Sequence, residues 1–169
     1  MKTALQENIV TTFKKLNTSL SSFSESELNT VPFEGSWTAA QVIRHLILGC
    51  SGYPEMFEGE TEKTTRKPDE KIKDIEALFY NFELKMQAAD FLTPENIEYN
   101  KNSLTLALLK IEEELLNVSE TYDLTLTYQD FELPGFGKFT FYEWINFALI
   151  HITRHLRQLD TISKIVIKQ

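Results

Sequence analysis

The chain has 169 residues, which suits one domain with a substantial core, and its 42% hydrophobic and 25% charged residues are ordinary for a globular protein. Seventeen basic against 25 acidic residues give a net charge of −8, which argues against nucleic-acid and anionic-membrane partners. A single cysteine, no membrane-length apolar run and no signal-peptide core at the N-terminus indicate a cytoplasmic protein without an internal disulfide.

The first predicted element is an amphipathic helix over residues 4–22, followed by a single helical turn within residues 24–29. Along the predicted helix, apolar residues recur at steps of three and four, namely Leu5, Ile9, Phe13, Leu16 and Leu20. This spacing places them on one face, which we expect to point into the core.

The second long helix has a sharp start, because Thr38 and Gln41 match the T-x-x-Q capping box. Trp37 and Val42 flank the cap at the positions of a hydrophobic staple. This helix carries His45 and is expected to falter between residues 49 and 54, where two glycines and a proline occur.

The middle of the chain is less regular. We expect a charged, mobile loop over residues 58–70 and a helix over residues 72–89 that the Thr-Pro pair at residues 93–94 interrupts. Residues 104–118 form a clean amphipathic helix. Residues 123–139 lack helical period, so we expect an extended connection with room for a short hairpin.

The last and longest helix begins at a second capping box, formed by Thr140 and Glu143. Two inward stripes run along it, and one of them carries His151, His155 and Gln158. The two histidines are four residues apart and therefore lie on the same face, one turn from each other.

The three histidines of the chain, His45, His151 and His155, all interrupt apolar runs. Three imidazoles can hold a metal ion and leave one coordination position open, so we interpret them as metal ligands. The alternative is that they are core histidines hydrogen-bonded to backbone or buried acids. A zincin-type peptidase is disfavoured, because the intervening glutamate of His-Glu-x-x-His is missing.

Four further residues lie near the histidines in the sequence, and three of them have two interpretations each. Gln158 could orient an imidazole or be an ordinary helix residue. Arg154 and Arg44 adjoin histidines and could hold an anionic substrate at a pocket rim, although surface salt bridges are the simpler interpretation. Cys50 lies about 140° round the helix from His45, which favours a buried structural thiol.

Two segments carry a resemblance to a known family. One is the Trp37-Thr38 dipeptide opening the helix of His45, and the other is P-x-x-G-x-x-T-x-x-E-W (Pro134 to Trp144) leading into H-x-x-x-H-x-x-Q (His151 to Gln158). From about residue 5 to residue 165, the chain resembles the DinB-like superfamily, which includes YfiT-like hydrolases and bacillithiol transferases. The resemblance implies a single domain over residues 1–169, all-α, with an antiparallel four-helix bundle and long connections.

The resemblance also implies that His45, His151 and His155 bind a divalent metal, commonly zinc or nickel. Family members with assigned reactions join a low-molecular-weight thiol to an electrophile, which a bound cation would assist by deprotonating the thiol. We therefore expect a metal-dependent transferase in stress or detoxification, acting on a small molecule. The alternatives are a metal-dependent hydrolase and a non-enzymatic metal-binding or structural interaction module. Pairing into a homodimer is a further option.

Overall fold

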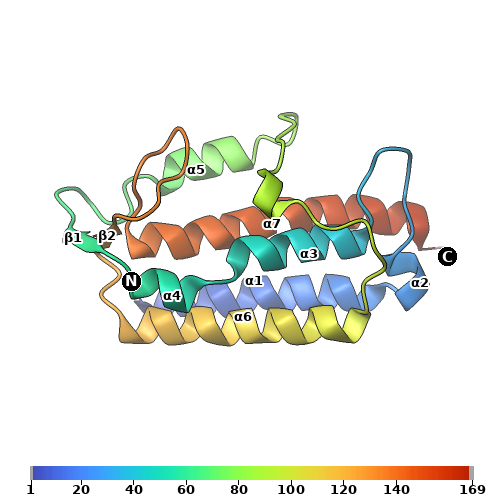
Figure 1. The fold of residues 1–169 in the computed structure, drawn as a ribbon, viewed down its shortest axis with the longest axis horizontal. Helices are drawn as coiled ribbons and strands as arrows, with labels where there is room; N and C mark the ends of the chain where they lie inside the picture. The colour runs from blue at the N-terminus through green and yellow to red at the C-terminus, as the bar shows by residue number, and fades with distance from the viewer. Residues whose placement is uncertain (1, 168–169) are drawn as a thin grey trace.

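The computed structural model describes residues 2–167 and places four long helices in a bundle (Figure 1). These helices are α1 (Lys2–Ser22), α3 (Ala39–Cys50), α6 (Lys101–Thr121) and α7 (Phe141–Val166). Helices α1 and α3 occupy opposite corners, because each packs against both α6 and α7. Two short helices, α2 (Glu25–Leu28) and α4 (Tyr53–Phe57), follow α1 and α3. The predicted all-α bundle is therefore confirmed.

The four long helices run in both directions along the bundle (Figure 1). Helices α1 and α6 are antiparallel, as shown by the Lys2 ammonium near the start of α1, which donates to the Glu120 carbonyl near the end of α6 at 2.6 Å. Helices α3 and α7 are also antiparallel, whereas α3 and α6 run the same way (Figure 1). The connection over residues 58–100 returns the chain to the end of the bundle at which α3 begins.

The loop predicted over residues 58–70 contains a short strand. Strand β1 (Thr61–Lys63) pairs antiparallel with β2 (Leu126–Tyr128), which lies in the second long connection, residues 122–140 between α6 and α7. That second connection also forms the short hairpin for which the sequence left room, because Leu133 and Gly137 form an isolated antiparallel bridge. Gly135, with a φ of 84°, supplies the left-handed turn between them.

The helix predicted over residues 72–89 is shorter than expected. Helix α5 spans Ile72–Phe79, and the chain then runs without helix to the 3-10 turn η1 (Asp90–Leu92). The Arg154 side chain of α7 donates to the carbonyl oxygen of Phe79 at 2.7 Å. This oxygen therefore accepts from Arg154 in place of the backbone amide of a further helical turn. The sequence could not reveal this contact, because it joins residues 75 positions apart.

Both predicted capping boxes are present. The Thr38 hydroxyl accepts from the amide of Gln41 at 3.1 Å, and the Gln41 side chain accepts from the amide of Thr38 at 3.0 Å. Thr140 and Glu143 repeat this reciprocal pair at the start of α7. These caps fix the residue at which each histidine-bearing helix begins.

Glu143 also anchors the first long connection. Its side chain is fully buried, and both carboxylate oxygens accept hydrogen bonds from the Arg66 guanidinium at 2.6 Å. The amide of Lys71 donates to the same carboxylate at 2.9 Å. The Thr140 hydroxyl donates to the carbonyl of Pro68 at 2.6 Å. Residues 66–71 are thereby fixed against the start of α7.

Within residues 2–167, the structure contains no helix long and apolar enough to span a membrane.

Arg66→Ala should lower the free energy of unfolding by about 3 kcal/mol, because it leaves the buried Glu143 carboxylate without its cation. Lys164→Ala is the matched control, since it breaks an exposed pair with Asp160 and should cost less than about 0.5 kcal/mol. Urea unfolding followed by circular dichroism measures both changes. Two equally small losses would contradict the anchoring role of the buried pair.

Candidate metal centre

His45 lies in the middle of α3 and points toward α7. Its side chain is 4% exposed, and the half-buried ring of Trp37 lies 5.2 Å from it between ring centroids. The residues around His45 in α3 are mostly apolar and buried, so the imidazole is the polar group of an otherwise apolar face.

His151 and His155 lie one turn apart on α7, as the four-residue spacing predicts. His151 is 8% exposed, and Phe147 stacks on it with a centroid distance of 5.9 Å and an interplanar angle of 4°. The ring of Phe79 meets His151 edge-on at 6.0 Å. His155 is half-buried and forms the more open side of the cluster. Aromatic rings therefore hold His151 in place.

The three imidazoles converge through their Nε2 atoms. The Nε2 of His151 lies 3.1 Å from that of His45 and 3.0 Å from that of His155. One ligand atom from each residue falls within 4.8 Å of the others. Nitrogen ligands about 2.0–2.1 Å from a tetrahedral zinc ion would be about 3.3–3.4 Å apart, and both Nε2 separations from His151 lie within about 0.4 Å of that spacing. The three donors therefore fit a metal ion.

Hydrogen bonds on the far side of two rings fix their tautomers. The Nδ1 of His45 lies 2.8 Å from the carbonyl oxygen of Leu92, which can only accept, so this Nδ1 carries the proton. The Nδ1 of His155 lies 2.8 Å from Oε1 of Gln158 and donates to it in the same way. Both Nε2 atoms are therefore left with a lone pair directed at the cluster, as metal ligation requires.

Burial keeps the three imidazoles neutral. Loss of solvation is the main cause that lowers the pKa of each histidine, and the pKa of His155 falls to about 4. The neighbouring imidazoles and the Arg154 guanidinium lower the pKa of His151 further. Among the described residues, no carboxylate joins the three histidines in a metal-binding cluster. No negatively charged ligand of this cluster would therefore offset the charge of a cation bound here.

The remaining sequence candidates lie in different settings. Gln158 contacts His155, as an orienting residue would. Arg154 donates to the carbonyl oxygens of Phe79, Asn81 and Leu84, so its guanidinium is engaged by backbone and forms no salt bridge with any residue of the 2–167 range. The sequence predicted either an anionic substrate or a surface salt bridge for Arg154, and it did not predict these backbone hydrogen bonds.

Arg44 and Cys50 lie away from the converging nitrogens. The Arg44 side chain lies beside the Tyr99 hydroxyl and lowers its pKa, against a larger rise caused by burial. Cys50 is 2% exposed, and burial raises the pKa of its thiol to about 12, so it is protonated at neutral pH. Cys50 is thus a structural thiol.

The sequence does not mark every contributor to the site, and the rings of Phe79 and Phe147 against His151 are examples. The Leu92 carbonyl is a backbone group at the end of η1, and no residue pattern marks such an acceptor. Trp37 occupies a staple position in the sequence, and its ring also packs against His45. The position of Trp37 directly before the cap of the helix that carries His45 is the sequence feature that could have indicated this contact.

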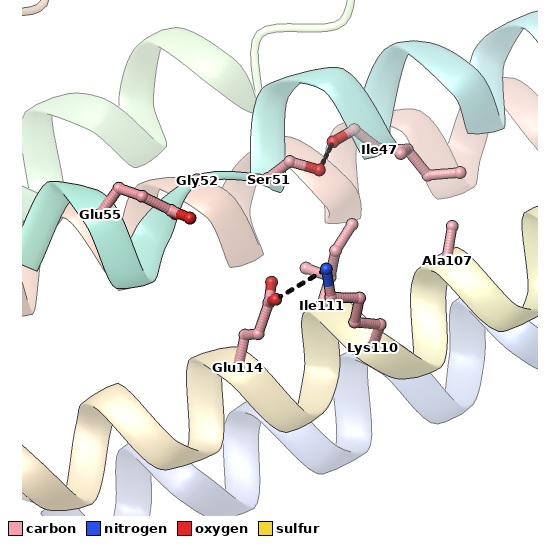
Figure 2. A pocket seen from close by; sticks show the side chains of 8 residues that line it. All are labelled: Ile47, Ser51, Gly52, Glu55, Ala107, Lys110, Ile111 and Glu114. Atoms are coloured by element: carbon pink, nitrogen blue, oxygen red, sulfur yellow. Dashed lines mark hydrogen bonds and ion pairs between the residues drawn. The ribbon is translucent and has the colours of Figure 1, made fainter.

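A separate cleft of about 430 Å³ lies between α3, α4 and α6 (Figure 2). Ile47, Ala107 and Ile111 form its apolar floor, and the Lys110–Glu114 pair lies at its rim. Ile47 is two residues from His45 and so faces nearly the opposite side of α3. The cleft is therefore unrelated to the histidine cluster.

The fold and the site together define an all-α bundle with a buried three-histidine cluster between two antiparallel helices. The family model described as the DinB superfamily matches residues 8–159, which is most of the chain. The chain therefore belongs to the DinB superfamily. It matches no curated protein and no solved structure.

The metal-free protein should lose stability as the pH falls below about 6.5. At that pH the unfolded histidines begin to bind protons, whereas burial keeps the folded ones neutral to lower pH, so protons favour the unfolded chain. The loss should continue down to about pH 4, the pKa of folded His155. Urea midpoints of chelator-treated protein at pH 7.5, 6.5 and 5.5 measure this loss.

A His151→Leu/His155→Leu variant is the control for that pH series, because leucine fills much of the space without titrating. Its midpoint should change much less between pH 7.5 and 5.5, the range in which histidine titrates and ordinary carboxylates do not. Parallel pH dependence in both proteins would contradict the burial of neutral imidazoles.

Proposed function

We propose that this protein is a divalent-metal-dependent transferase that joins a low-molecular-weight thiol to a small electrophile. The observation that carries the proposal is the convergence of three neutral imidazoles, two of them with tautomers fixed by Leu92 and Gln158. Zinc and nickel both accept such ligands, and availability decides between them.

The charge of the site favours an anionic nucleophile. Three neutral imidazoles cancel none of the charge of a divalent cation, and Arg154 adds a further positive charge nearby. A cation bound to them would supply the positive charge that deprotonates a thiol at neutral pH. The role of the histidines is to hold that charge in a site from which water is largely excluded.

The thiol must come from outside the chain. Cys50 is the only cysteine, and it is buried with a thiol pKa raised to about 12. It also lies about 140° round α3 from His45 and so points away from the cluster. A soluble thiol entering at the half-buried His155 would meet no competing thiolate from the protein.

The walls of the site favour an electrophile with an apolar portion. Trp37 lies against His45, and Phe79 and Phe147 lie against His151. These side chains contribute apolar surface and leave few polar groups to bind a highly hydrated substrate. Small alkylating or arylating toxins have this character, which agrees with a role in detoxification.

The test combines metal analysis with a thiol-consumption assay. Protein purified without a histidine tag and reconstituted with zinc or nickel should hold about one metal ion per chain. With cysteine, glutathione or bacillithiol and a bimane electrophile, it should accelerate thiol consumption. His151→Ala should lower the rate at least about tenfold, because one of three ligands is lost. Cys50→Ala is the matched control and should retain the rate.

Other outcomes point to the alternatives. Hydrolysis of ester or amide probes without added thiol would indicate that the metal activates water instead. Metal binding without either reaction would indicate a non-enzymatic module. Absence of bound metal after reconstitution would mean that the histidines are core residues.

A further inference from the structure

One irregular segment links the two histidine-bearing helices. We call residues 80–92 the strap, which runs from the end of α5 to the end of η1 (Figure 1). Arg154 of α7 holds one end of the strap, and His45 of α3 holds the other. The strap therefore joins α7 to α3 beside the three converging imidazoles.

The attachment to α7 depends on one arginine. The Arg154 guanidinium donates to the carbonyl oxygens of Phe79 at 2.7 Å, Asn81 at 3.0 Å and Leu84 at 2.6 Å. Phe79 ends α5, so the positive charge also lies at the negative end of that helix. A planar guanidinium can hold carbonyls at three positions from separate nitrogens, whereas a lysine would have to reach all of them from a single nitrogen.

The attachment to α3 is the hydrogen bond between His45 and Leu92. The Leu92 carbonyl accepts from Nδ1 of His45 at 2.8 Å, and the turn before it is closed by the Leu92 amide donating to the Ala89 carbonyl at 2.9 Å. Gly49 of α3 lies below the Leu92 side chain, since a Cβ there would be 3.9 Å from Cδ2 of Leu92. The end of the strap thus rests directly on α3.

We propose that Arg154 is a positioning residue for the metal centre, acting through the strap. By holding residues 79–84 on α7, it keeps the Leu92 carbonyl in place against His45. That carbonyl keeps the proton of His45 on Nδ1 and leaves the Nε2 lone pair for a cation. The proposal rests on the metal site proposed above, and it assigns Arg154 to the protein's own backbone rather than to an anionic substrate.

The coupling must work in both directions. A cation on Nε2 favours the Nδ1–H tautomer of His45 and so strengthens the bond to Leu92. Because binding free energies are reciprocal, an arginine that stabilises the strap strengthens cation binding, and the cation in turn orders the strap. Metal binding should therefore slow amide exchange in the strap.

The experiment compares the full-length protein with Arg154→Ala, Arg154→Lys and Lys164→Ala. Lys164 is the control, because it also lies on α7 and, among the described residues, pairs only with the exposed Asp160. Hydrogen exchange of peptides covering residues 80–92 is measured with and without Zn²⁺. Co²⁺ affinity is measured from its visible absorption. The tautomer of His45 in metal-free protein is read from long-range ¹H–¹⁵N NMR correlations.

In the parent protein, Zn²⁺ should slow exchange in the strap, and metal-free His45 should carry its proton on Nδ1. Arg154→Ala should weaken Co²⁺ binding about tenfold, the lower end of the range for outer-shell partners, because loss of the positioned His45 outweighs removal of a positive charge near the site. It should also remove most of the metal-dependent protection and give a mixture of His45 tautomers. Arg154→Lys should recover part of each effect, and Lys164→Ala should match the parent.

Parent-like Co²⁺ affinity and strap exchange in Arg154→Ala would overturn the role of Arg154. This outcome would not contradict the proposed metal site. A parent protein that binds no metal would refute the proposed function instead. In that case the tautomer of His45 in metal-free protein still tests whether Arg154 positions His45. A mixture of His45 tautomers only in Arg154→Ala supports it, and identical tautomers in both proteins overturn it.

Discussion

Three imidazole nitrogens facing one another in an apolar helix interface set the central constraint on this structure. The Nδ1 protons of His45 and His155 are committed to Leu92 and Gln158, so two Nε2 lone pairs point at the Nε2 of His151. A neutral His151 can donate one proton to only one of them. A divalent cation between the three nitrogens would satisfy all of them at once, which is the physical reason for regarding the cluster as a metal centre.

The bundle aligns the helices so that these nitrogens meet. Capping boxes at Thr38 and Thr140 fix where α3 and α7 begin. The Tyr53 hydroxyl, in α4 just after α3, donates to the Trp144 carbonyl at 2.8 Å and holds this part of the chain against the start of α7. Buried Glu143 then ties the first long connection to the start of α7. The site is thus built on regular helices, whose geometry is more exact than that of loops.

The regular helices could be predicted because each has a local signal. The cap at Thr38 and the four-residue spacing of His151 and His155 are contained within single helices, and both appear in the fold as expected. The early end of α5 and the place of Leu92 could not be predicted, because they depend on contacts from α7 and α3. The partner of His45 is a backbone carbonyl, which every residue carries, so its identity gives no sequence signal.

The most direct test of the central claim is X-ray absorption spectroscopy of the zinc-loaded protein without any added low-molecular-weight thiol. The structure predicts three imidazole nitrogens at about 2.0–2.1 Å from the metal and one further light atom. Replacing His45 with alanine should remove one imidazole from that shell. Fewer than three imidazoles in the parent, or a sulfur ligand that would have to come from Cys50, would contradict the account.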